Sequence, residues 1–160
     1  MAFGESDPLL LADLEYQWWY AIAFQAFSQI QALEKFRDFD QFFQTLYKHF
    51  SSEKPWFVYP DVIPTLHYWQ KKGIKLGVIS NFDSRLDQVL VQLELTDFFS
   101  QIICSSRQTI AKPDPRIFQL ALDHWGCLPS QAWHIGDSLR EDYNGATAAG
   151  LKAFLIQPSD

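Results

Sequence analysis

Short apolar runs alternate with helical patterns through the second part of the chain, and this alternation restricts the possible folds more than any other feature. Four runs are expected to be strands: residues 74–80, 101–105, 132–135 and 153–156. Strands that alternate with helices of this length are joined by right-handed crossovers and form a parallel sheet with helices on both faces. The sequence therefore predicts a doubly wound α/β fold for this part of the chain.

Caps and glycines mark where the intervening helices begin and end. Asp114 followed by Pro115 predicts a helix start, because the carboxylate accepts free N–H groups and proline suits the first helical position. Gly126 predicts the end of that helix. Further helices are expected from Pro60 to Gly73, through Leu86–Leu93, and around residues 142–149 with Gly150 closing the last one.

The first fifty residues carry two helical patterns with aromatic faces. Asp7 and Pro8 predict the start of the first helix. The same offsets recur in the second helix, so we expect the two faces to pack together or against a common partner. A boundary near residues 56–60 predicts a helical lobe over 1–57 and an α/β part over 58–160. The aromatic faces consist of Tyr16, Trp19, Tyr20, Ala23, Phe24 and Phe27, and of Phe39, Phe42, Phe43, Leu46, Tyr47 and Phe50.

Charge and cysteine content argue against several classes of protein. Thirteen Lys and Arg residues against 19 Asp and Glu residues give a net charge of −6, and no basic cluster occurs, so a nucleic-acid partner is not expected. Cys104 and Cys127 cannot form a multi-disulfide framework, which favours a reduced, cytoplasmic setting. The apolar stretch 18–27 is too short to span a bilayer, so no membrane association is expected.

Polar side chains follow three of the predicted strands, where ligands bind in a doubly wound sheet. Ser80 and Asn81 follow the first strand, Lys112 lies in the loop after the second, and Asp137 and Asp142 follow the third. Asp137 offers the hard oxygen ligands that Mg²⁺ prefers, while Lys112 supplies a positive charge for a phosphate. Ser80 and Asn81 add neutral donors. Together these groups predict phosphoryl transfer.

Each of these residues also has a purely structural explanation. Ser80 and Asn81 would cap the following helix, and Lys112 before a proline would be a solvated loop lysine. Asp137 and Asp142 would complement the dipole of the next helix. The functional interpretation rests on the fact that all five residues follow the ends of three predicted strands.

Other potentially reactive side chains are expected to be structural. The four histidines lack the spacing of metal ligands, and His134 is expected to be a core histidine bonded to the backbone. Cys104 is expected to be a buried strand residue, because no paired histidine is suggested. Asp38 and Asp40 are expected to start the second aromatic helix.

Three segments resemble motifs two, three and four of the haloacid dehalogenase (HAD) superfamily, in both order and spacing. They are Gly77–Asp83 (GVISNFD), Lys112–Phe118 (KPDPRIF) and His134–Ala146 (HIGDSLREDYNGA). The resemblance covers about residues 60–156 and implies a Rossmann-like parallel core. The aromatic lobe before it resembles the helical cap that subclass I members insert between motifs one and two.

The resemblance implies a role for each polar residue at the strand ends. Ser80 would bind the transferring phosphoryl group with Asn81 beside it, and Lys112 would steady the negative charge of nucleophile and phosphate. Asp137 would bind Mg²⁺, and Asp142 would orient a metal-bound water or Lys112. The glycine-aspartate form of the fourth motif resembles the phosphatases of the family. The implied activity is Mg²⁺-dependent hydrolysis of a small phosphorylated metabolite.

The first motif of the family does not occur in this sequence. Its strand ends in Asp-x-Asp-x-Thr, whose first carboxylate attacks phosphorus, and Asp83 or Asp114 cannot replace that group without rebuilding the site. We therefore expect a truncated chain that is inactive alone. In the family this strand lies between those ending at Ser80 and Gly136, so we expect two strand pairs with exposed inner edges, and marginal stability or self-association.

Three functions remain open at this point, and the sequence does not decide whether the chain itself is an enzyme. The first is a HAD-like hydrolase, specifically a phosphatase. The second is a non-catalytic fragment or pseudoenzyme that retains a phosphate and metal pocket or acts as an interaction module. The third is metal-free dehalogenation, which the glycine-aspartate form of motif four disfavours.

Overall fold

The computed structural model describes residues 1–156, so the last four residues of the predicted α/β part, 157–160, lie outside the described residues. Short turns η1–η5 connect the main elements, and η5 is a π-helical turn. The elements are α1 (Pro8–Gln29), η1 (Leu33–Lys35), α2 (Phe39–His49), α3 (Val62–Lys71), β1 (Gly77–Ser80), α4 (Arg85–Gln92), η2 (Thr96–Phe98), β2 (Gln101–Cys104), η3 (Ser105–Arg107), α5 (Pro115–Trp125), η4 (Pro129–Gln131), β3 (Trp133–Gly136), η5 (Leu139–Asn144), α6 (Gly145–Ala148) and β4 (Lys152–Leu155).

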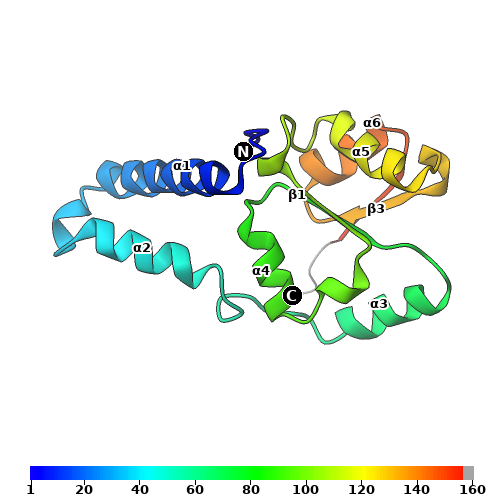
Figure 1. The fold of residues 1–160 in the computed structure, drawn as a ribbon, viewed down its shortest axis with the longest axis horizontal. Coiled ribbons are helices and arrows are strands. Elements are labelled where there is room, and N and C mark those ends of the chain that lie inside the picture. The colour runs from blue at the N-terminus through cyan, green and yellow to red at the C-terminus, as the bar shows by residue number, and fades with distance from the viewer. Residues whose placement is uncertain (157–160) are drawn as a thin grey trace.

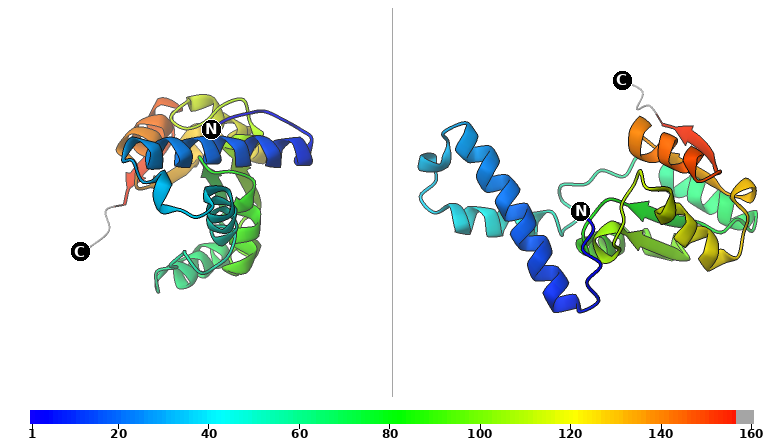
Figure 2. Two further views of the ribbon diagram at one scale, coloured as in Figure 1. Left: turned by 90° about the vertical axis from the view of Figure 1, so that its left-hand side faces the viewer. Right: turned by 90° about the horizontal axis from the view of Figure 1, so that it is seen from above.

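The helices α1 and α2 lie side by side and project from the rest of the molecule (Figures 1 and 2). The predicted start of α1 is confirmed, since Asp7 Oδ1 accepts the backbone N–H groups of Leu9 and Leu10 at 2.9 and 3.5 Å. Asp38 caps α2 in the same way, by accepting the N–H of Gln41 at 2.9 Å. No helix within residues 1–156 has both the length and the apolar character needed to cross a membrane.

Aromatic rings hold α1 and α2 together, as the sequence predicts. The ring centroids of Tyr16 and Phe43 are 5.1 Å apart, and those of Tyr20 and Phe43 are 5.2 Å apart. Edge-to-face pairs of this kind stabilise the contact beyond their buried area. The placement of Trp19 on this face is wrong, because its indole N–H donates instead to Asp83, just after β1, at 2.7 Å.

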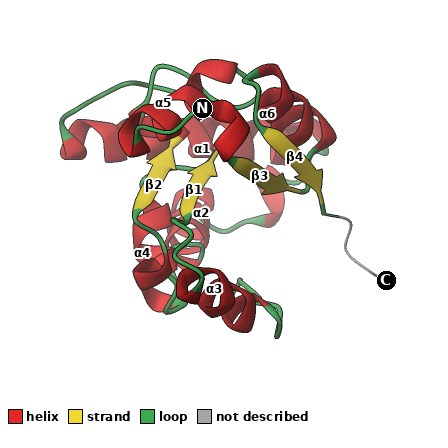
Figure 3. Cartoon of the chain, turned by 90° about the vertical axis from the view of Figure 1, so that its right-hand side faces the viewer, coloured by secondary structure: helices red, strands yellow, loops and turns green. Residues whose placement is uncertain are grey.

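The four strands form two separate parallel pairs rather than one sheet. In β1–β2, Gly77 is opposite Gln101, and in β3–β4, Trp133 is opposite Lys152. Within residues 1–156 no strand ladder joins the two pairs, which occupy the two sides of Figure 3. The predicted pairing is confirmed, and β1 and β3 each leave a row of backbone groups without a strand partner within the described residues.

The β1–β2 pair is covered by helices on both faces. Alternate side chains point to opposite faces. Ile79 and Ile103 contact the core around α5, while Val78 and Ile102 contact a second cluster that includes side chains of α3 and α4. The core around α5 is the larger cluster. Three side chains of that helix, Ile117, Phe118 and Leu122, are at most 1% exposed. Its buried members are Ile103, Ile117, Phe118, Ala121, Leu122, Ala146 and Leu151.

Within residues 1–156 one face of the β3–β4 pair is largely exposed, so the expectation of helices covering both faces is wrong here. The outward side chains Trp133, Ile135 and Ile156 are 57%, 55% and 53% exposed, and Phe154 is 38% exposed. Trp69 of α3 reaches Trp133, with ring centroids 6.3 Å apart. This leaves an apolar surface, which we call the outer β3–β4 face, formed by Trp133, Ile135, Phe154 and Ile156.

Most predicted elements differ from those observed by one or two residues at an end, and two differ by more. Residues 74–76 do not belong to β1, because its ladder with β2 begins where Gly77 meets Gln101. The predicted helix over 142–149 divides into η5 and α6. The wider π-helical turn contains Asp142, which lies against the backbone of Gly136.

Truncation of the central core side chain is expected to unfold the protein more readily. Phe118 is fully buried in the α5 cluster, so Phe118→Ala is expected to lower the free energy of unfolding by roughly 3–5 kcal/mol. Urea unfolding monitored by circular dichroism measures this loss. The matched control is Leu9→Ala, because Leu9 is 82% exposed and its truncation is expected to change stability by less than about 0.5 kcal/mol.

Candidate active site

The loops that follow β1, β2 and β3 meet through three of the predicted site residues. Asn81 Oδ1 accepts the backbone N–H of Lys112 at 2.8 Å, and Asn81 Nδ2 donates to the Lys112 carbonyl at 2.8 Å. Lys112 Nζ lies 2.5 Å from Asp142 Oδ1. The structure therefore brings Asn81, Lys112 and Asp142 together at the carboxyl ends of the strands, where the sequence places them.

Lys112 is held inside the protein rather than in solvent. Its side chain is 11% exposed and that of Asp142 is 5% exposed, so the two form a buried ion pair. Removing one member of such a pair leaves an uncompensated buried charge, which is strongly destabilising. The explanation of Lys112 as a solvated loop lysine does not hold in this structure.

Asp142 has two partners in addition to Lys112. Besides Lys112, its Oδ1 contacts His134 Nε2 at 2.9 Å, and its Oδ2 accepts the backbone N–H of Ser138 at 3.0 Å. Burial raises the pKa of Asp142, but the hydrogen bonds from His134, Lys112 and Ser138 outweigh burial and bring the pKa below its ordinary value. The carboxylate is therefore charged at neutral pH, which strengthens its hold on Lys112.

Gly136 is required by the close approach of Asp142. A Cβ atom at position 136 would lie 2.2 Å from Cγ of Asp142 and 2.5 Å from its Oδ2. Real Cβ contacts are essentially never shorter than 3.0 Å, so any other residue would displace the carboxylate. The glycine at the end of β3 thus makes room for the group that fixes Lys112.

Asn81 uses its whole side-chain amide to fasten these loops. In addition to its two bonds with Lys112, Asn81 Nδ2 donates to Glu141 Oε2 at 3.2 Å. Neither Ser80 nor Asn81 caps α4, because Ser84 is the cap residue of that helix. Ser80 is half-buried at the last position of β1, and its hydroxyl makes no hydrogen bond within residues 1–156.

Asp137 lies directly after β3 with an exposed side chain, so the structure does not tie it into the cluster around Asp142. Within residues 1–156 no three His, Cys, Asp or Glu side chains gather in a way that could hold a metal ion. Mg²⁺ commonly takes only one or two carboxylates and completes its octahedron with water and substrate oxygens. Asp137 fits Mg²⁺ in that limited sense, as a single protein carboxylate.

Two further residues belong to this cluster, although the sequence does not single them out as site residues. His134 bonds the carboxylate of Asp142 and not the backbone, so its expected partner was wrong. Glu141, which accepts a hydrogen bond from Asn81, precedes Asp142 in η5 and gives no separate signal in the sequence. Only the fold brings residue 81 to residue 141.

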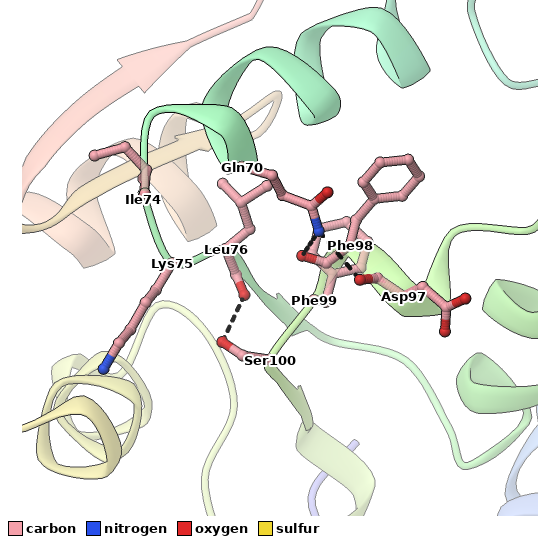
Figure 4. Close-up of a pocket in the computed structure, with 9 residues that line it drawn as sticks. Gln70, Ile74, Lys75, Leu76, Asp97, Phe98, Phe99 and Ser100 are labelled. Carbon is pink, nitrogen blue, oxygen red and sulfur yellow. Dashed lines mark hydrogen bonds between the residues drawn. The ribbon is translucent and has the colours of Figure 1, made fainter.

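The cavity drawn in Figure 4 lies at the opposite end of β1 from this cluster. Its volume is about 440 Å³, and it is lined by the end of α3, residues 73–76 and η2. Gln70 closes one wall by donating from Nε2 to the carbonyl of Asp97 at 3.1 Å. Because parallel strands bind ligands at their carboxyl ends, this cavity is not the candidate active site.

Comparison with known protein families gives a match over most of the chain. Residues 8–150 match the model of the haloacid dehalogenase-like hydrolases. The chain is 38% identical over 141 residues to "Haloacid dehalogenase-like hydrolase domain-containing protein 3" from Bos taurus, an alignment that covers 88% of this chain and 56% of the bovine protein. The chain thus spans little more than half the length of this relative.

Two further comparisons concern phosphatases. The chain is 32% identical over 142 residues to a glyceraldehyde 3-phosphate phosphatase from Methanothermobacter thermautotrophicus, with 77% of this chain and 63% of that protein covered. The crystal structure of a HAD phosphatase from Thermococcus onnurineus superposes with a TM-score of 0.61 and 35% identity, over 62% of this chain and 46% of that one. These similarities confirm the α/β fold expected from the sequence.

Acidification is expected to weaken the fold through His134. Burial lowers the pKa of His134 below its ordinary value of 6.5, the nearby Lys112 charge lowers it further, and the bond to Asp142 opposes both. The folded protein therefore keeps the imidazole neutral, whereas the unfolded chain takes up a proton as the pH falls through about 6.5. The stability that the neutral imidazole contributes is present above that pH and decreases below it.

The measurement is urea unfolding at about pH 7.5 and about pH 5.5 for the wild type and His134→Gln. Glutamine can still donate to Asp142 but does not titrate. We expect the variant to lose less stability than the wild type over this interval. An equal loss in both proteins would show that other groups dominate the pH dependence.

Proposed function

The chain belongs to the haloacid dehalogenase-like hydrolases, and on that premise we propose that it is the phosphate-binding part of a Mg²⁺-dependent phosphatase for small phosphorylated metabolites. Residues 1–57 would be part of a helical cap and residues 58–160 part of the α/β core. The observation that carries the proposal is the Lys112 ammonium, fixed by Asn81 and Asp142 where the loops after three strands meet. The cytoplasm is the compartment that we propose for it.

A phosphate would be bound mainly by Lys112 and Ser80. Lys112 has three N–H donors and gives only one short contact to Asp142, so the others are left for phosphoryl oxygens. The Ser80 hydroxyl adds a neutral donor at the end of β1. Because the Asn81 amide is occupied by Lys112 and Glu141, we assign Asn81 the task of orienting the lysine. Such preorganised donors stabilise negative charge without having to reorganise.

Asp137 would hold the divalent cation, which would neutralise phosphoryl oxygens when it is bound. The carboxylate is exposed and directly follows β3, the strand whose final glycine accommodates Asp142. The chain itself would then contribute one metal ligand, Asp137, and one fixed positive charge, Lys112, to phosphate binding. The phosphatases among its relatives support this choice of substrate class.

The second candidate function is phosphate binding without turnover, and it is favoured by the surroundings of Asp83 and Asp114, the two aspartates considered as replacements for the missing nucleophile. Asp83 is fully buried and bonded to Trp19 and Arg85, so its carboxylate cannot attack a substrate. Asp114 caps α5 and binds the Arg116 guanidinium. Without an attacking carboxylate, we propose that the chain by itself does not hydrolyse phosphate esters.

Hydrolysis by the chain itself is distinguished from binding without turnover by measuring both in the same preparation. With Mg²⁺ and an aryl phosphate, we expect no hydrolysis by this chain above the uncatalysed rate. With Mg²⁺ and inorganic phosphate, we expect binding by isothermal titration calorimetry that Asp137→Ala weakens by at least about tenfold. The matched control is Asp97→Ala, which removes an exposed carboxylate at the other end of β1.

Three results are informative here. Hydrolysis that disappears in Asp137→Ala would mean that the chain provides a nucleophile, and the proposal of an inactive chain would be wrong. Absence of phosphate binding in the wild type would contradict the proposed site. Equal weakening by Asp137→Ala and Asp97→Ala would indicate a general charge effect and argue against a metal ligand at Asp137.

We also propose that the chain self-associates through its uncovered strands. Apolar surfaces of this kind, beside unpaired strand edges, are typical association sites. The outer β3–β4 face includes Ile135, which is 55% exposed. Sedimentation velocity over the micromolar range is expected to show concentration-dependent association that Ile135→Lys reduces. Leu128→Lys is the control, because Leu128 is 65% exposed but lies outside this face. A monomer at every concentration would contradict the proposal.

A further inference from the structure

Two fully buried carboxylates lie between the helical lobe and the turn after β1, away from the bonds of the candidate active site. They are Glu15 of α1 and Asp83 of the β1–α4 turn. Buried carboxylates are costly unless their oxygens are bonded. The partners of these two groups therefore show which parts of the chain must stay together.

Glu15 is bonded to a single residue of the turn. Its Oε1 accepts the backbone N–H of Ser84 at 2.8 Å, and its Oε2 accepts the Ser84 hydroxyl at 2.5 Å. No lysine or arginine pairs with Glu15 among the described residues. If the helical lobe moved away, Glu15 would lose both of its bonds to Ser84, so the lobe and Ser84 are expected to move as one unit.

Asp83 makes a second link between the same two parts. Its Oδ2 accepts the indole N–H of Trp19 from α1 at 2.7 Å, and its Oδ1 accepts Arg85 Nε at 2.8 Å. Arg85 Nη1 in turn donates to the carbonyl of Tyr47 in α2 at 2.8 Å, and the guanidinium carbon lies 3.6 Å from the centre of the Tyr47 ring. Both helices of the lobe are thus tied to residues 83–85.

The turn itself has little freedom to absorb a displacement. Only Phe82 and Asp83 separate Asn81 from Ser84, and the Phe82 carbonyl accepts Cys104 Sγ at 2.9 Å and the Ser106 N–H at 3.4 Å. Because only two residues intervene, we expect a shift of residues 83–84 to reach Asn81. Asn81 holds both the N–H and the carbonyl of Lys112.

We propose that Glu15 and Asp83 are positioning residues through which the helical lobe sets the position of Asn81, and through Asn81 that of Lys112. The bonds of Glu15 to Ser84 and of Asp83 to Trp19 carry this coupling. Its relevance to phosphate rests on the proposed function, but the positioning itself exists without a ligand and is measured without one.

The test is hydrogen exchange of the Lys112 amide, which is bonded to Asn81 Oδ1, measured by NMR on the full chain. Glu15→Leu removes both bonds to Ser84 and is expected to accelerate this exchange by about tenfold, relative to an amide in the middle of α5. Glu15→Gln is the conservative variant. Its carbonyl can accept from the Ser84 N–H and its amide can donate to the Ser84 hydroxyl, so exchange is expected to stay near the wild-type rate.

The control for general loosening of the lobe is Phe36→Ala. Phe36 packs on Phe42, with ring centroids 4.4 Å apart, and neither residue contacts the turn through a hydrogen bond. If Phe36→Ala accelerates Lys112 exchange as much as Glu15→Leu does, or if Glu15→Leu leaves it unchanged, the proposal is wrong. Should Glu15→Leu not fold, Ser84→Ala removes the hydroxyl bond alone and is expected to give a smaller acceleration, whose absence would also overturn the proposal.

Titration with inorganic phosphate and Mg²⁺ separates this proposal from the proposed function. If the wild type binds phosphate, Glu15→Leu is expected to bind it several-fold more weakly although residue 15 is not part of the site. Equal binding would contradict positioning. If the wild type binds no phosphate, the proposed function fails, while the exchange of Lys112 still decides whether the lobe positions Asn81.

Discussion

The buried ion pair between Lys112 and Asp142 connects two halves that no continuous sheet connects. The β1–β2 and β3–β4 pairs share no ladder within residues 1–156. Lys112 lies in the loop after β2 and Asp142 in the turn after β3, so their contact, together with the core around α5, holds the pairs in place. The absence of a Cβ at Gly136 is what allows the carboxylate to come this close.

Hydrogen bonding of buried charge explains why so many polar residues lie near the strand ends. Asp142 is satisfied by an ammonium, an imidazole and a backbone N–H, whereas Glu15 has only the N–H and hydroxyl of Ser84. Each arrangement removes the cost of burial only in one geometry. The need to bond buried carboxylates therefore fixes Lys112 through Asp142, and we propose that it also fixes Asn81 from the helical lobe, through Glu15.

Much of this arrangement follows from local sequence patterns. The caps Asp7 and Asp114 and the left-handed Gly126 lie where the sequence predicts the ends of helices. The separation into two strand pairs is predicted from the family resemblance, because the sequence lacks the strand that carries the family's first motif. Periodicity alone does not predict it. Prediction was less successful for Trp19 and His134, because a helical pattern or an apolar strand does not show which distant carboxylate a side chain will meet.

The order of helices and strands, the family resemblance, and the placement of polar residues after β1, β2 and β3 all follow from the sequence. These depend on periodicity, caps and motif spacing, which are properties of neighbours along the chain. Folding is needed to bring Asn81 to Lys112 and Glu141, and Glu15 to Ser84, a residue 69 positions away in the chain. Such contacts depend on how elements pack, because burial makes each carboxylate bond whatever donor the fold brings within reach.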